Sequence, residues 1–270
     1  MKYIKLVILI LVVLLCSTAH ANLLGRYFSG TSFDPNGIIL TTGLTYQFSR
    51  VDANIEYWNG SQYYRWQPIA NYPDNYTVEW TGYMKIDLPG EYGFGTISDD
   101  GSQIWINDKR TVDNGESQWY DWEDNMGEND KGIPAQPVNL DVGYHKIMVR
   151  FYEGSNHDGI ELWWLLPGSG LSDIPYYGTT FHGTPPTANP NTNWNIIPDD
   201  VLFTEDEFNQ LVCAMDLNSD GIINFYEFSI MAANWQTSAI ASQGDFNTDG
   251  VVDVEDLGQL SIFWLKSCLP

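Results

Sequence analysis

A repeat of 29 residues in the C-terminal part of the chain limits its fold more than any other feature of the sequence. A shift by 29 residues superposes Asp216, Asn218, Asp220, Gly221 and Trp235 on Asp245, Asn247, Asp249, Gly250 and Trp264. Because such a match rarely arises by chance, we expect both segments to adopt the same local structure. The segment 199–270 also contains 13 of the 35 acidic residues but only one of the 12 basic residues. Its fold must therefore accommodate many carboxylates.

Each repeat contains a loop whose polar residues have the spacing of metal ligands. DLNSDGIINFYE (216–227) and DFNTDGVVDVED (245–256) place oxygen ligands at positions one, three and five, glycine at six and a carboxylate at twelve. An EF-hand loop has this pattern, because roughly six to eight oxygens surround calcium and the glycine permits a sharp turn. The predicted ligands are Asp216, Asn218, Asp220, the Ile222 carbonyl, Asn224 through water and Glu227, then Asp245, Asn247, Asp249, the Val251 carbonyl, Asp253 through water and Asp256. A solvated acidic turn is the alternative, but two loops in register favour two calcium ions.

The region around these loops resembles a type I dockerin. Each loop is followed by a predicted helix that ends in a tryptophan, and Thr204 with Glu207 forms a capping box before an earlier helix. The resemblance implies a small all-α EF-hand domain at 199–270 with a cohesin-like protein partner. Cellulosomal dockerins commonly carry Ser-Thr at loop positions ten and eleven, where this chain has Phe225-Tyr226 and Val254-Glu255. This departure leaves the calcium fold intact but argues against a typical cohesin as the partner.

The N-terminal residues 1–21 have the pattern of an export signal. Lys2 and Lys5 precede an apolar run over 6–15, and Ala19-His20-Ala21 supplies small residues at a cleavage site. The run is shorter than the roughly 20 residues of a membrane-spanning helix. Cys16 raises a lipoprotein as the alternative, although the preceding Leu15 is bulky. We expect a secreted protein without a membrane span, either free or attached to the cell surface.

Export bears on the two cysteines that remain after cleavage. Cys213 and Cys268 have a single intramolecular pairing, which an oxidising compartment favours. Closing the loop between them would stabilise the C-terminal domain by about 4 kcal/mol in the chain-entropy model. Two buried free thiols are the alternative.

Residues 22–167 have the composition of an all-β domain. Short runs rich in β-branched and aromatic residues alternate with turn signals such as Pro89-Gly90, Asp100-Gly101 and Asp158-Gly159. A sandwich or a barrel is the simplest architecture. Residues 168–198, dense in Gly, Pro, Thr and Asn without periodicity, are interpreted as a linker. The predicted fold class is therefore multidomain, with an all-β sandwich followed by a small all-α domain.

Three blocks of the β domain resemble the protective-antigen fourteen-kilodalton domain, a β-sandwich of glycosidases, toxins and flocculins. They are LLGRYFSG (23–30), the segment 80–114 with its SDDGS turn, and LDVGYHKIMVRFYEGSNHDGIELWW (140–164). In sugar-binding members, two aspartates joined by a cis peptide hold a calcium ion that vicinal sugar hydroxyls also bind. The resemblance assigns this role to Asp99 and Asp100, and a second ligand loop to Asn156 and Asp158. A β-turn with Gly101 at positive φ is the alternative for the aspartates.

Three aromatic residues lie in an irregular polar stretch of the β domain. Trp119, Tyr120 and Trp122 could stack on the apolar faces of sugar rings, or they could cap the edge of the sandwich. The sequence does not separate these two interpretations.

Charge and motifs narrow the classes of function. A net charge of -23 argues against binding to nucleic acid. The sequence contains no G-x-S-x-G, no H-E-x-x-H and no phosphate-binding glycine loop, so an enzyme is not expected. The sequence predicts a secreted, non-catalytic, calcium-dependent carbohydrate-binding protein with a module that docks to a protein scaffold or cell surface. A structural or adhesive protein and an accessory subunit of a polysaccharide-degrading system are the alternatives.

Overall fold

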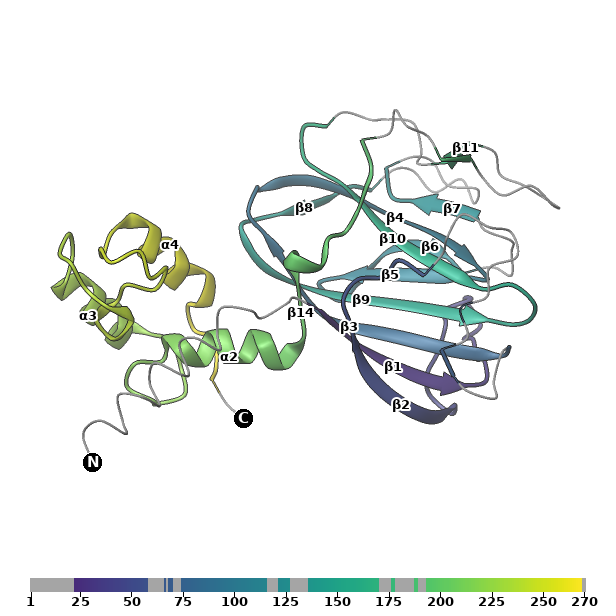
Figure 1. Ribbon diagram of the computed structural model, residues 1–270, viewed down its shortest axis with the longest axis horizontal. Helices are drawn as coiled ribbons and strands as arrows, with labels where there is room; N and C mark the ends of the chain where they lie inside the picture. The colour runs from purple at the N-terminus through teal and green to yellow at the C-terminus, as the bar shows by residue number, and fades with distance from the viewer. Residues whose placement is uncertain are drawn as a thin grey trace. The chain divides into compact units, whose positions relative to one another are not determined.

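A computed structural model describes residues 22–57, 66, 68–69, 74–115, 121–126, 136–169, 176–177, 187–188 and 193–268 (Figure 1). The chain divides into two compact units. Unit 1 comprises Met1–Asp141 and His145–Thr204, and unit 2 comprises Val142–Tyr144 and Glu205–Pro270. The predicted signal 1–21 and the side chains of Trp119 and Tyr120 lie outside the described residues. Within the described residues, no helix has the length and apolar character needed to cross a membrane.

Unit 1 is built on two β-sheets. The larger one has seven strands in the order β2-β1-β3-β9-β5-β6, with β14 paired to β3. Its strands are β1 (Leu23–Ser29), β2 (Thr45–Asp52), β3 (Tyr76–Ile86), β5 (Ser102–Ile106), β6 (Lys109–Asn114), β9 (Gly143–Glu153) and β14 (Leu202–Phe203).

The smaller sheet has five strands in the order β13-β10-β4-β7, with β8 paired to β4. Its strands are β4 (Gly90–Asp99), β7 (Asp121–Asp124), β8 (Val138–Leu140), β10 (Gly159–Leu165) and β13 (Asn195–Ile196). A separate two-stranded ribbon joins β11 (Tyr176–Tyr177) to β12 (Thr187–Ala188).

One apolar core joins the two large sheets. The apolar residues of β3 alternate along the strand, and Val78 and Trp80 belong to the same buried cluster as Phe94 of β4 and Leu162 of β10. This alternation is what a strand produces when one face is turned to the core. The predicted β-sheet fold is therefore confirmed.

The chain returns to both sheets in the last residues of the segment interpreted as a linker and directly after it. Trp194, Ile197 and Leu202 are buried, β13 pairs with β10, and β14 pairs with β3. The short helix η2 (Asp199–Val201) lies between these two strands. The last residues of the predicted linker and the first of the predicted C-terminal domain thus belong to unit 1, because their apolar side chains pack on its sheets.

Unit 2 contains the helices α2 (Glu205–Met215), α3 (Phe225–Ala233) and α4 (Val254–Phe263), with the short helix η3 (Ala241–Gln243) between the last two. The sequence repeat is also a structural repeat. Asn224 and Asp253, at equivalent positions, begin α3 and α4 with the same capping box. Gly221 and Gly250 both have positive φ, at 89° and 94°. This left-handed conformation is the one that position six of the loop requires glycine to adopt.

The two repeats of unit 2 complete each other through backbone pairing. Ser238, after α3, bridges to Val251 in the second loop, and Ser267, after α4, bridges to Ile222 in the first loop. A disulfide joins Cys213 to Cys268, with 4.8 Å between the Cα atoms. The bridge therefore connects the end of α2 to the segment that pairs with the first loop.

Candidate functional site

The turn between β4 and β5 presents two adjacent buried aspartates. Asp99 is the last residue of β4, Asp100 follows it, and the peptide bond between them is cis. Their exposed fractions are 5% and 6%. The backbone N–H of Gly154, from the loop after β9, donates to Oδ2 of Asp100 at 2.8 Å. A Cβ on residue 154 would lie 3.1 Å from that oxygen, so glycine allows the backbone to approach the carboxylate closely.

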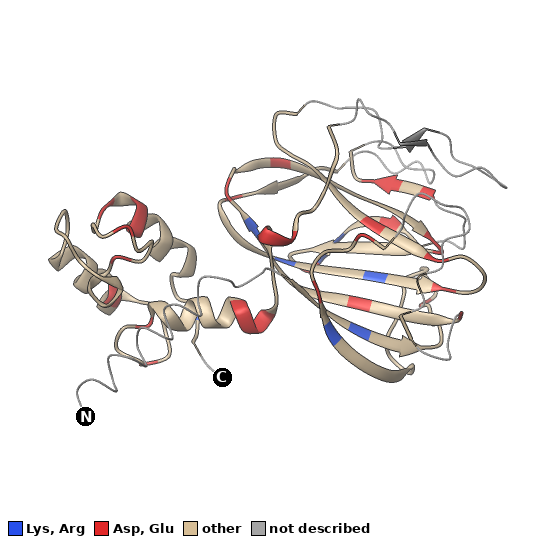
Figure 2. Cartoon of the chain, viewed as in Figure 1, with Lys and Arg blue, Asp and Glu red and all other residues tan. Residues whose placement is uncertain are grey.

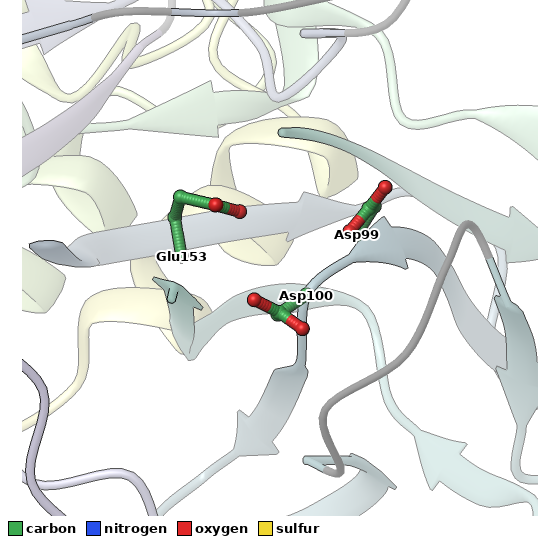
Figure 3. A group of neighbouring side chains, drawn as sticks. All are labelled: Asp99, Asp100 and Glu153. Carbon is green, nitrogen blue, oxygen red and sulfur yellow. The ribbon is translucent and has the colours of Figure 1, made fainter. Parts of the chain in front are cut away.

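Glu153, the last residue of β9, turns a third carboxylate toward this turn. One oxygen from each of Asp99, Asp100 and Glu153 lies within 4.8 Å of the other two, and Figure 3 shows the side chains facing one another. Glu153 is fully buried, and neither of its carboxylate oxygens has a hydrogen-bond partner. A buried acceptor without a partner is costly, and these three carboxylates lie close enough together to hold a cation.

The electrostatics of the cluster support a cation. Burial, together with Asp100, Asp99, Asp158 and Asp74, raises the pKa of Glu153 to about 10. Burial, Asp100 and Asp158 likewise raise the pKa of Asp99 to about 8. Carboxylates forced together in a buried place keep protons unless a positive charge replaces them. Because all three donors are hard oxygens, calcium or magnesium fits the set better than a metal that prefers nitrogen or sulfur.

The first loop of unit 2 contains a second buried acceptor of this kind. Glu227 is fully buried; its Oε2 accepts the N–H of Asn224 at 2.9 Å, whereas its Oε1 has no partner. The N–H of Gly221 donates to Asp216 Oδ2 at 2.9 Å, and Asn218 Nδ2 donates to Asp220 Oδ2 at 2.8 Å. The acids that the sequence predicts as ligands are therefore linked by hydrogen bonds within one loop, and Glu227 Oε1 has no partner.

The second loop has the same glycine-to-aspartate hydrogen bond as the first, but its last acid, Asp256, accepts hydrogen bonds through both of its oxygens. Asp245 is buried, accepts the N–H of Gly250 at 3.1 Å through Oδ2, and has no partner at Oδ1. Asp256 accepts N–H groups of Phe246 and Asn247 through Oδ1 and of Asp253 through Oδ2. Both loops thus keep one unpartnered buried oxygen, on Glu227 in the first and on Asp245 in the second.

The comparison with protein families finds a match within unit 1. Residues 59–177 match the model of the PA14 domain. This part of unit 1 is therefore similar to a PA14 domain. No curated protein matches the chain.

Several solved structures resemble the chain. An anti-sigma factor domain-containing protein is 20% identical with a TM-score of 0.44; the match covers 69% of this chain and 48%, about half, of the other. The PA14 domain of the antifreeze protein MpAFP is 16% identical with a TM-score of 0.43, over 68% of this chain and 91% of the other. The epithelial adhesin 6 A domain from Candida glabrata, solved in complex with Galb1-3GlcNAc, is 16% identical with a TM-score of 0.44, over 70% of this chain and 90% of the other.

The loop after β9 differs from the assignment that the sequence resemblance implies. Asp158 is fully buried and accepts hydrogen bonds from the backbone N–H of Trp66 and the hydroxyl of Tyr76. Asn156 is exposed at φ 85°, and its amide donates to Ser155 Oγ at 3.3 Å. Of the acids in this loop, it is Glu153 that joins the two aspartates. Its position two residues after the buried Phe151 is the signal that could have identified it, because alternate strand residues share a face.

Trp122 of unit 1 makes the contacts of a packed side chain. It pairs with Ile97 of β4, and a Cβ on Gly95 would lie 2.6 Å from its ring. Its ring lies nearly perpendicular to those of Trp163 and Trp194, at centroid distances of 6.3 Å and 5.1 Å. These contacts favour the capping interpretation for Trp122. Trp119 lies outside the described residues.

In the presence of a chelator, the stability of unit 1 should fall as the pH rises. The pKa of Glu153 is raised from 4.5 to about 10, so the folded state binds the proton more tightly than the unfolded state. Stability from this group is complete below pH 4.5 and is lost progressively up to about pH 10, by at most about 1.4 kcal/mol per pH unit. Denaturant titrations with EDTA between pH 5 and 8 measure the slope, which Glu153→Gln should reduce. A slope that is the same in wild type and variant would contradict the expectation.

Proposed function

We propose that the chain is a secreted, non-catalytic protein whose PA14 domain binds carbohydrate through a calcium ion. The observation that supports this most directly is the cluster of Asp99, Asp100 and Glu153, with its fully buried carboxylate that lacks a partner. Calcium bound there would supply open coordination positions for the vicinal hydroxyls of a sugar. Export through the N-terminal signal would place the site outside the cell, where calcium is abundant.

The residues of the PA14 domain have separate parts in this proposal. Asp99, Asp100 and Glu153 hold the ion. The N–H of Gly154 orients Asp100, and Asp158 anchors the following loop through Trp66 and Tyr76. Because these polar groups are buried and fixed before the ion arrives, little conformational entropy is lost on binding.

Loss of one aspartate of the cluster should abolish glycan binding. We expect Asp100→Asn to reduce binding on a glycan array by at least about tenfold, because the variant weakens the ion and loses a hydrogen bond to Gly154. EDTA should have the same effect on the wild type. The matched control is Asp87→Asn, which removes the same charge from a side chain that is 70% exposed and paired with Lys85. Glycan binding that survives both EDTA and Asp100→Asn would rule out the calcium lectin.

For unit 2, we propose a dockerin-like module that binds two calcium ions and a cohesin-like partner. The buried unpartnered oxygens of Glu227 and Asp245 support the ions. Phe225, Tyr226 and Val254, at loop positions ten and eleven, are 75%, 49% and 68% exposed. A cohesin that recognises a Ser-Thr motif should present polar groups to it. Since the side chains here are apolar or aromatic, the surface of this partner should be apolar at the same place.

A structural or adhesive role is the second candidate function. The aromatic exposure at Phe225 and Tyr226 favours it, because such side chains are frequent in protein interfaces. Protein capture without glycan binding on the array would favour adhesion. Hydrolysis of a polysaccharide by the chain itself, lost in Asp100→Asn, would contradict the non-catalytic proposal.

A further inference from the structure

The loop between β9 and β10, residues 154–158, makes hydrogen bonds in two directions. At its start, the N–H of Gly154 donates to Oδ2 of Asp100 at 2.8 Å. Two residues later, the N–H of Asn156 donates to Oδ1 of Asp74, just before β3, at 2.9 Å. Asn156 has a φ of 85°, a left-handed conformation that most residues avoid. The loop therefore links the carboxylate cluster to the start of β3.

The end of this loop is anchored in the core of unit 1. Asp158 is fully buried and accepts the backbone N–H of Trp66 and the hydroxyl of Tyr76. Tyr76, the first residue of β3, is also fully buried, and its ring centroid lies 6.0 Å from that of Phe151. The ring of Trp66 stacks on that of Tyr57 at a centroid distance of 3.9 Å. Packing therefore fixes both donors, and a hydrogen bond to a carboxylate is stronger than one between neutral groups.

The loop lies among acids and brings no Lys or Arg of its own. Residues 154–158 read GSNHD. The basic residues that the structure describes in unit 1 lie on strands of the seven-stranded sheet (Figure 2). The hydrogen bonds that hold Asn156 and Asp158 have backbone N–H groups and a hydroxyl as donors, and these are uncharged. Removal of the hydroxyl therefore changes the anchoring of the loop without changing the charge near the cluster.

The anchoring bears on the cluster through the residue that precedes the loop. Glu153 ends β9, and one of its oxygens lies within 4.8 Å of oxygens of Asp99 and Asp100 (Figure 3). Binding is tighter when the binding groups are held in place before the ligand arrives. Residues that hold metal ligands in position commonly change metal affinity by roughly ten- to hundredfold. A loop that merely completes the fold would have no such effect.

We propose that Tyr76 and Asp74 are positioning residues for the ion site, which hold the loop 154–158 so that Glu153 stays turned toward Asp100. The inference rests on the proposed function, because it requires an ion at the cluster. Neither Tyr76 nor Asp74 belongs to the cluster, and each acts through the loop.

The first test removes one buried hydroxyl from the full chain. Tyr76→Phe is compared with Tyr27→Phe, because Tyr27 is equally buried and its hydroxyl donates to Asp52 at 2.6 Å, outside the loop. Competition with a chelator measures calcium affinity, and the binding step that Asp100→Asn removes identifies the site. We expect Tyr76→Phe to weaken this step by about tenfold and Tyr27→Phe to leave it unchanged.

The second test uses a partly exposed position, where a substitution disturbs the core less. Asp74→Asn removes the charge but keeps an oxygen that can accept the N–H of Asn156, whereas Asp74→Ala removes both. Because the change of charge is the same in the two variants, the difference between them reports the hydrogen bond. We expect Asp74→Ala to bind calcium several-fold more weakly than Asp74→Asn.

Hydrogen exchange in EDTA measures the loop without an ion. The segment 153–158 should exchange faster in Tyr76→Phe than in the wild type, and Tyr27→Phe should leave its rate unchanged. Calcium affinity that is the same in Tyr76→Phe and the wild type, or an equal loss in Tyr27→Phe, would overturn the positioning role and leave the ion site standing. A wild type that loses no binding step in Asp100→Asn would overturn the ion site, and the positioning role with it.

Discussion

Chelation of calcium is expected to unfold much of unit 2 in the full chain and to reduce its helical circular dichroism. Without the ions, Glu227 and Asp245 keep buried oxygens with no partner, and the loops hold many acids close together. An ion present at a hundred times its dissociation constant stabilises the folded state by about 2.7 kcal/mol, so two sites add about 5 kcal/mol. Calorimetric titration should return two sites in unit 2.

The number of calcium ions bound per chain tests this prediction more sharply. Glu227→Gln should remove one of the two sites and leave the second loop able to bind. Glu205→Gln, which removes an exposed acid at the start of α2, is the matched control and should leave both sites. A helical signal that is equal in EDTA and calcium would contradict the calcium-dependent fold.

Removal of the disulfide is expected to destabilise unit 2 by about 4 kcal/mol. Cys213 and Cys268 are separated by 55 residues. Cys213 lies just before the first loop, and Cys268 lies in the segment that pairs with this loop. The N–H of Cys268 donates to the carbonyl of Gly221 at 2.9 Å, and the carbonyl of Cys213 accepts the N–H of Asp216 at 3.3 Å. Cys213→Ser with Cys268→Ser should therefore also weaken calcium binding at the first loop more than at the second.

The repeat supplies the control for the disulfide. Ala239 is equivalent to Cys268 and donates its N–H to Gly250 at 3.1 Å without any covalent bridge. Ala239→Ser should change the free energy of unfolding little. Thermal unfolding and calcium titration of both variants measure the difference. Equal stability of the double serine variant and the wild type would show that backbone pairing alone holds the first loop.

Features that depend on residues close together in the sequence could be predicted from it. The loop pattern, the β-rich composition and the Asp99-Asp100 turn are each local. Glu153 escaped prediction because it meets Asp100 across 53 positions of sequence, and only the pairing of β9 with β5 brings the two together. Trp122 was ambiguous for a similar reason, since its packing depends on the absence of a side chain at Gly95. The stretch around Trp194 lacks periodicity, and its contacts with the sheets decide its structure.

The crossed pairing within unit 2 also bears on the order in which it can fold during synthesis. The first loop leaves the ribosome before the second, yet its pairing partner at Ser267 follows the second helix of the repeat. Ser238, the pairing partner of the second loop, is synthesised before that loop. The later half of the duplication can thus assemble first, and the earlier half must wait for it. A single repeat cut from this chain would lack the residue to which its loop bridges, so the smallest unit that can complete both loops is the pair of repeats.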